Sequence, residues 1–84
     1  MFVAEYENGK WTKAYIEPYR DVPMSYALAA LHYGQAIFEG MKAYKNEKGE
    51  VALFRPEKNY ARLNKSAIRM AMPEVPEELF FNAF

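Results

Sequence analysis

The stretch between Pro56 and Pro73 has the pattern of one long helix. Proline is favoured at the first position of a helix, because the N–H that it lacks would have no intrahelical partner there. Beyond it, apolar residues recur at steps of three and four: Tyr60, Leu63, Ala67 and Met70. That spacing places them on one face of a helix. We therefore predict a helix from Pro56 to Met72 with a single apolar stripe that faces a sheet.

The first part of the chain has the pattern of a β-hairpin. Phe2–Tyr6 and Lys10–Ile16 are rich in aromatic and branched residues, which favour strands. Asn8-Gly9 lies between them, and this pair tolerates the positive φ angles of a tight turn. Further on, Ser25 is placed to cap a short helical turn over residues 26–30.

A second hairpin is predicted before the long helix. Ile37–Tyr44 and Val51–Phe54 have strand composition, and the polar, glycine-ending segment Asn46–Gly49 connects them. After the long helix, residues 76–84 begin with proline and two glutamates, which favour a helix start. The sequence therefore predicts an α+β fold in which antiparallel hairpins pack against one or two helices.

Composition excludes several classes of protein. The 84 residues include 11 Lys and Arg and 11 Asp and Glu, so net charge gives no reason to expect nucleic acid or a membrane as partner. Cysteine is absent, and His32 is the one histidine, so we expect no metal site and a hydrogen-bonded, structural His32. The first residues lack the pattern of a signal peptide, and we expect a cytoplasmic protein.

Four basic residues follow one another at helical steps, namely Lys58, Arg62, Lys65 and Arg69. On a helix they share one face. Such a face is ordinarily solvated, but an arginine in it can also grip a phosphate group through paired hydrogen bonds. The residues alone leave both interpretations open.

Two longer runs carry a resemblance to a known family. LHYGQAIFEGMKAY spans Leu31–Tyr44, and LFRPEKNYARL spans Leu53–Leu63, followed by Ser66-Ala67. At this spacing they resemble the small domain of branched-chain amino acid aminotransferases, which are fold-type IV pyridoxal-phosphate enzymes. The resemblance covers the chain from about Asn8 to Phe84. It implies that residues 1–84 are a partial N-terminal small domain, roughly a quarter of a complete family member.

The resemblance implies roles for five residues. Arg62 matches the arginine that holds the phosphate of pyridoxal 5'-phosphate. Phe38 matches the aromatic wall of the substrate pocket, and Tyr33 matches the tyrosine that reaches into the neighbouring subunit of a homodimer. Gly40 matches a glycine that leaves room at the pocket, and Lys42 matches the basic residue just after it.

The activity implied by the resemblance is transfer of an amino group between leucine, isoleucine or valine and 2-oxoglutarate. The lysine that carries the cofactor in this family belongs to a large domain, and no lysine here matches its motif. We therefore expect no catalytic residue within the 84 residues and no activity from this chain alone. The apolar residues that close the sequence lead us to expect that it is a fragment.

Two other functions are retained as alternatives. A sister enzyme on the same scaffold, such as a D-amino acid aminotransferase or aminodeoxychorismate lyase, would share the fold, although FEGMKAY favours the branched-chain group. A non-catalytic interaction module would instead use the aromatic residues around Phe84 as a docking surface.

Overall fold

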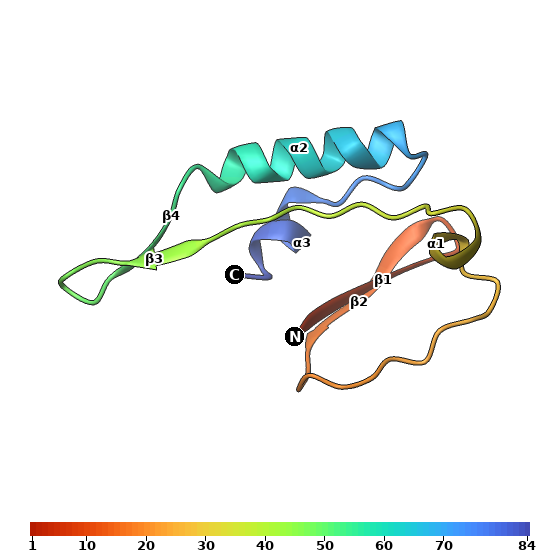
Figure 1. Cartoon of the computed structure of the whole chain (residues 1–84), viewed down its shortest axis with the longest axis horizontal. Coiled ribbons are helices and arrows are strands. Elements are labelled where there is room, and N and C mark those ends of the chain that lie inside the picture. Colours follow the sequence, from red (N-terminus) through yellow and green to blue (C-terminus); the bar gives the residue numbers. More distant parts are fainter. The chain divides into compact units, whose positions relative to one another are not determined.

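A computed structural model describes all of residues 1–84 and confirms the α+β class (Figure 1). The elements along the chain are β1 (Phe2–Glu7), β2 (Lys10–Ile16), α1 (Ala29–His32), β3 (Ala43–Lys45), β4 (Val51–Leu53), α2 (Pro56–Arg69) and α3 (Glu77–Phe81). None of the helices has the length and apolar composition needed to cross a membrane. The chain divides into two units, one formed by Met1–Gln35 with Val75–Phe84 and the other by Ala36–Glu74.

The predicted first hairpin is confirmed in the first unit. β1 and β2 pair antiparallel, and the register shifts once between Ala4 and Tyr6. Asn8 and Gly9 form the turn with φ angles of 51° and 79°, which is the left-handed conformation that these residue types tolerate. Beside the turn, the rings of Tyr6 and Trp11 meet edge to face, with centroids 5.4 Å apart. This cross-strand aromatic pair helps to hold the register.

The short helix of the first unit begins later than predicted. The Ser25 hydroxyl accepts a hydrogen bond from the Ala27 amide at 3.1 Å, so Ser25 does cap a turn. Helix α1 itself starts only at Ala29 and has four residues. The prediction of a hydrogen-bonded His32 is confirmed, because its Nε2 donates to the carbonyl oxygen of Tyr26.

Helix α3 places an aromatic cluster at the end of the chain. Phe80 is buried, and its ring lies 5.2 Å from that of Phe81 and 5.3 Å from that of Phe84, measured between centroids. The helix was predicted to run to Phe84 and ends at Phe81. The last backbone groups form tighter turns, in which the Ala83 amide donates to the Phe80 carbonyl.

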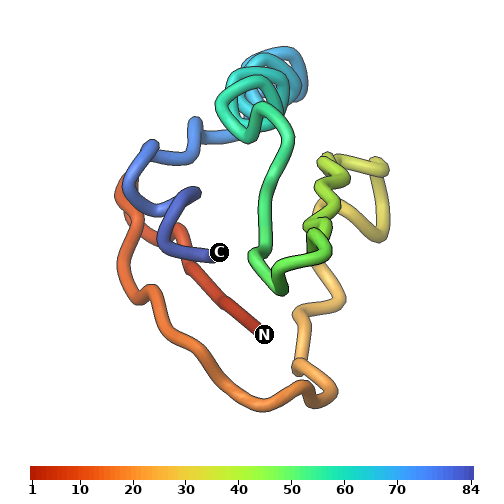
Figure 2. Tube along the Cα trace, turned by 90° about the vertical axis from the view of Figure 1, so that its left-hand side faces the viewer, coloured from red at the N-terminus to blue at the C-terminus, as the bar shows by residue number.

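In the second unit, the strand predicted over Ile37–Tyr44 is much shorter. Only Ala43–Lys45 pairs with β4, with Ala43 opposite Leu53. Residues 37–42 lack a partner strand, because the chain turns away after Leu53 and begins α2 at Pro56. Figure 2, in which α2 is seen along its axis, shows the chain passing from this hairpin directly into the helix. The segment 36–42 is thus extended without a sheet.

Helix α2 has the predicted apolar stripe, but the helix makes no extensive contact with the β3–β4 sheet of its own unit, so the predicted packing against that sheet is wrong. Ala67 has no exposed surface, and Tyr60, Leu63 and Met70 are half-buried. The buried face of the helix also includes one polar residue, Asn59, which lies one turn before Leu63. The pattern of apolar side chains does not reveal it. The helix therefore buries one face, as its sequence period requires.

The carboxyl end of α2 is closed by a residue in a left-handed conformation. The Met72 amide donates to the Ala67 carbonyl, and the Ala71 amide donates to the Ile68 carbonyl. Together with the φ of 53° at Ala71, these two bonds form a Schellman motif. The helix was predicted to reach Met72 and ends at Arg69, because the motif reverses the chain at Ala71.

We expect Ala71→Gly to stabilise the chain. The left-handed conformation is unfavourable for alanine and open to glycine, and removal of this strain should contribute about 0.5–1 kcal/mol. Thermal unfolding followed by circular dichroism would test this, with Ala61→Gly in the middle of α2 as a control that should destabilise. A lower midpoint for Ala71→Gly would contradict the assignment of the motif.

Candidate functional site

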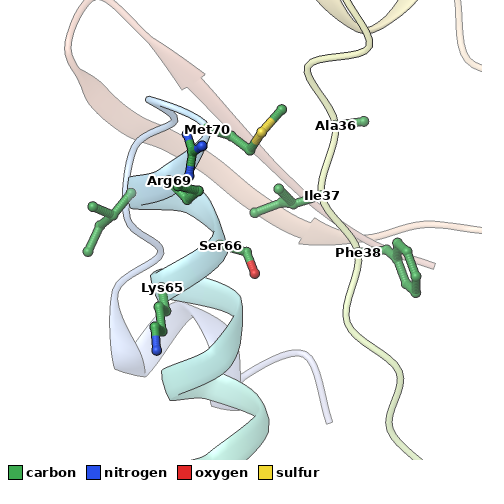
Figure 3. A pocket seen from close by; sticks show the side chains of 8 residues that line it. Ala36, Ile37, Phe38, Lys65, Ser66, Arg69 and Met70 are labelled. Atoms are coloured by element: carbon green, nitrogen blue, oxygen red, sulfur yellow. The ribbon is translucent and has the colours of Figure 1, made fainter.

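The candidate site is built where the extended segment 36–42 runs along helix α2. Side chains of an extended segment point alternately to opposite sides. Figure 3 shows Ile37 directed at Ser66 and Met70 of α2, whereas Phe38 lies on the opposite side of the segment. The next residue, Glu39, again faces the helix and bonds to two of its side chains. The segment therefore directs Ile37 and Glu39 toward α2 and directs Phe38 to the side that faces away from α2.

Glu39, Asn59 and Arg62 form a hydrogen-bonded cluster between the segment and the helix. Arg62 donates to Glu39 through Nε, at 2.8 Å from Oε2, and through Nη2 to Oε1. The Asn59 amide nitrogen donates to Glu39 Oε1 and to the Gly40 carbonyl oxygen, each at 2.9 Å. Asn59 and Arg62 are three residues apart on α2, so their side chains lie on neighbouring positions of one helix face.

The charges in this cluster stabilise one another. Hydrogen bonds from Arg62 are the main cause that holds the pKa of the Glu39 carboxyl below its ordinary value, and the bond from Asn59 adds to the effect. The same pairing raises the pKa of the Arg62 guanidinium. The Glu39 side chain is 10% exposed and that of Arg62 is 62% exposed. The carboxylate is thus enclosed, while the guanidinium remains open to solvent.

Acid is expected to weaken this cluster. The folded-state pKa of Glu39 is lowered, so the carboxylate contributes stability above its ordinary value of 4.5, and this contribution is lost as the pH falls through the lowered pKa. The midpoint of thermal unfolding should therefore fall less steeply with acid in Glu39→Gln than in the original chain. Glu57→Gln is the control, because its carboxylate lies 3.9 Å from Arg55 and is exposed. Parallel curves for the original chain and Glu39→Gln would contradict the assignment.

A cavity of about 380 Å³ lies beside the cluster. It is lined by Gly40, Met41, Lys42, Tyr44, Phe54, Arg55, Lys58, Asn59 and Arg62. Four of these side chains are cationic, and the amino end of α2 also lies here, since Arg55 is its N-cap residue. A helix amino end carries a partial positive charge, so the cavity combines several favourable features for an anion.

Among the cationic side chains of this cavity, Lys42 contacts an aromatic ring. Its ammonium lies 5.7 Å from the centre of the Tyr44 ring, a cation–π geometry.

Two backbone positions at the cavity also stand out. Arg55 has a left-handed backbone with φ of 50°, which is unusual for a residue other than glycine. A side chain added at Gly40 would meet no atom within 4 Å, so the packing of this chain does not require glycine there.

A second cavity, of about 670 Å³, lies further along α2 (Figure 3). It is lined by Ala36, Ile37, Phe38, Lys65, Ser66, Ile68, Arg69 and Met70. Lys65 and Arg69 line this cavity, whereas Lys58 and Arg62 line the first. The four basic residues that share a helical spacing are therefore divided between two different cavities.

The structure brings together three of the five residues predicted for the site. Gly40, Lys42 and Arg62 line the first cavity. Phe38 lines the second and is 93% exposed, so it is not part of the core of this chain. Tyr33 belongs to the first unit, at the carboxyl end of α1, and is 87% exposed. The roles of all five remain predictions.

Sequence reasoning missed the residues that hold Arg62 in place. Glu39 and Asn59 lie within the two runs that carry the resemblance, but neither is among the five residues to which the resemblance assigns a role. A signal was nevertheless present, because Ile37 and Glu39 have the two-residue spacing that puts both on the same side of an extended segment. Arg55 was also missed, and its place directly before the helix-starting Pro56 is the feature that could have revealed it.

Curated relatives match nearly the whole chain. It is 48% identical over 84 residues to branched-chain-amino-acid transaminase 1 of Bacillus subtilis, and the match covers 99% of this chain and 24% of that protein. It is 46% identical over 82 residues to branched-chain-amino-acid aminotransferase of Helicobacter pylori, covering 98% of this chain and 24% of the relative. A probable branched-chain-amino-acid aminotransferase of Staphylococcus epidermidis is 54% identical over 79 residues, covering 93% of this chain and 22% of the relative.

These matches confirm the resemblance predicted from the sequence. The chain is similar to branched-chain aminotransferases over nearly all of its residues and spans about a quarter of their length. No family model matches the chain.

Proposed function

We propose that this chain is the N-terminal part of the small domain of an aminotransferase that acts on branched-chain amino acids. The identity of 46% and 48% to proteins with that name is the observation that carries the proposal. The substrates would be leucine, isoleucine or valine and a 2-oxo acid such as 2-oxoglutarate. A sister activity on the same scaffold is less well supported, because these relatives are named for the branched-chain reaction.

The first cavity fits the phosphate group of pyridoxal 5'-phosphate. A phosphate monoester carries close to two negative charges at neutral pH, and guanidinium groups bind it through charge-assisted hydrogen bonds. Lys42, Arg55, Lys58 and Arg62 supply four cationic side chains around this cavity. Of these, Arg62 is held by a fixed acceptor on one side and exposed on the other, so we assign the phosphate contact to Arg62, with Lys42 nearby.

When bound, pyridoxal phosphate supplies the electron sink that stabilises negative charge on the substrate. The residues of this chain would bind the cofactor and the substrate and orient them relative to each other. Phe38 would form an apolar wall against an aliphatic side chain, which loses water there. Gly40 lies two residues further along the same extended segment and leaves space, and its exposed position agrees with a role outside the packing of this chain. Tyr33 would reach the pocket of the neighbouring subunit in a homodimer.

The proton transfers of the reaction need a lysine outside residues 1–84. We place it in a large domain that would join to this one, and we place the complete homodimer in the cytoplasm without a nucleic acid or membrane partner. The 84 residues by themselves would bind the cofactor reversibly and would not catalyse.

Titration of this chain with pyridoxal phosphate tests the proposal. We expect weak, reversible binding that competes with inorganic phosphate, and after reduction with borohydride we expect mass spectrometry to show no single lysine modified stoichiometrically. Stable modification of one lysine in this chain would contradict the assignment of that lysine to another domain. Absence of any phosphate-dependent binding would remove the first cavity as the cofactor site.

Phe38→Ala in the complete enzyme tests the substrate pocket. Because an aliphatic substrate gains more than glutamate from an apolar wall, the change should lower kcat/KM for leucine about 10-fold or more relative to that for glutamate. Steady-state kinetics with both amino acids would measure this difference. Val51→Ala, at another exposed apolar position in the same unit, is the control. Equal losses with both substrates would point to a structural role for Phe38.

A further inference from the structure

The guanidinium of Arg62 is held on one edge only. Its Nε and Nη2 groups both donate to the Glu39 carboxylate. A guanidinium has five N–H donors, so three are not engaged by Glu39, and two of the three are on Nη1. The edge formed by Nη1 and Nη2 can bind a phosphate through two parallel bonds. The pairing with Glu39 therefore fixes the plane of the side chain without occupying that edge.

Glu39 is itself held in place. Asn59 donates to its Oε1, and the neighbouring Gly40 carbonyl accepts from the same amide nitrogen. Asn59 is buried and the Glu39 side chain is only 10% exposed. A carboxylate anchored in this way cannot follow a moving arginine into solvent. It acts as a fixed acceptor for an arginine that is 62% exposed.

We propose that Glu39 is a positioning residue, which orients Arg62 so that its outer edge binds the phosphate group of the cofactor. This inference rests on the proposed function, because it assumes that Arg62 is the phosphate-binding residue. A free arginine side chain must lose rotational freedom when it binds a ligand, and that freedom corresponds to about 30-fold in affinity. Glu39 removes much of it before the ligand arrives.

The opposing effect is electrostatic repulsion between the carboxylate and the phosphate. For a doubly charged ligand about 6 Å away in solvent close to water at about 0.15 M salt, it weakens binding about threefold. The gain from orientation is therefore larger than the loss from repulsion. The two effects have opposite signs, so removal of Glu39 distinguishes them.

The experiment measures binding of inorganic phosphate and of pyridoxal phosphate to this chain and its variants. Glu39→Ala should weaken binding of both ligands about tenfold, although it removes a negative charge. Glu39→Gln, which keeps one acceptor oxygen, should give a smaller loss. Glu57→Gln removes a carboxylate beside Arg55 instead and should leave binding unchanged or slightly tighter. Tighter binding in both Glu39 variants would overturn the inference and identify the carboxylate as a competitor of the ligand.

Two readouts separate this inference from loss of folding and from failure of the proposed function. The nitrogen-15 signal of the Arg62 Nε–H group, recorded without ligand, should show slow solvent exchange in the original chain and fast exchange in Glu39→Ala, while circular dichroism stays constant. Slow exchange in both would overturn the positioning role. If Arg62→Ala leaves phosphate binding unchanged, the phosphate contact that the proposed function assigns to Arg62 fails. If Arg62→Ala weakens binding and Glu39→Ala does not, only the role of Glu39 fails.

Discussion

Replacement of Arg62 by alanine is expected to weaken binding of pyridoxal phosphate about 10- to 100-fold, the range associated with loss of charge-assisted hydrogen bonds. The side chain combines an exposed guanidinium with a fixed acceptor on its inner edge. The two lysines of the cavity, Lys42 and Lys58, cannot replace it, because a lysine presents a point charge without the paired donors of a guanidinium. Dissociation constants from absorbance or calorimetric titration of the complete enzyme would measure the effect.

Two further variants sharpen this test. Arg62→Lys keeps the charge and loses the paired geometry, so it should recover only part of the affinity. Lys65→Ala removes a cation from the same helix at the second cavity and should leave cofactor binding unchanged. Equal affinities for the original enzyme and Arg62→Ala would exclude Arg62 from the cofactor site.

Replacement of Asn59 by alanine is expected to destabilise the second unit by about 1–2 kcal/mol net. The buried amide donates two hydrogen bonds, and their loss leaves the Gly40 carbonyl without this partner, which costs about 1–3 kcal/mol. Alanine is the better helix former by up to about 0.7 kcal/mol, so local preference alone predicts a small gain. The two estimates differ in sign, and the hydrogen bonds are the larger effect.

Thermal unfolding followed by circular dichroism distinguishes these outcomes. A net loss of about 1–2 kcal/mol lowers the midpoint by about 4–16 °C for a chain of this size. Lys65→Ala, at an exposed position of α2, should change the midpoint little. A higher midpoint for Asn59→Ala would show that the bonds to Glu39 and Gly40 contribute less than helix preference.

The sequence was sufficient to predict local elements, and the reason is that each has its own signal. The turn at Asn8-Gly9 and the stripe that includes Ala67 depend on residues close in the chain. The strand predicted over Ile37–Tyr44 was too long, because pairing depends on the length of the partner strand, and β4 ends at Leu53. The end of α2 was also misplaced, since alanine carries no signal for the left-handed conformation that Ala71 adopts.

The site was predicted in part for a related reason. Similarity to a family indicated Arg62 and Lys42, which the structure places at one cavity. It did not indicate what holds Arg62, because Glu39 lies 23 positions earlier in the chain and no local pattern joins the two. Only the path of the extended segment along α2 brings them together. Contacts of this kind depend on the path of the chain and not on the residue types alone.

The amide nitrogen of Asn59 couples two features that would otherwise be independent. Through one NH₂ group it bonds to the carboxylate that holds Arg62 and to the backbone carbonyl of Gly40. Asn59 and Arg62 are both on α2, so a shift of the helix along its axis would move Arg62 and would also strain the hydrogen bonds that hold Glu39 and the backbone at Gly40. In the proposed enzyme, Asn59 would thus link the residue that holds Arg62 to the backbone at Gly40, two residues beyond Phe38.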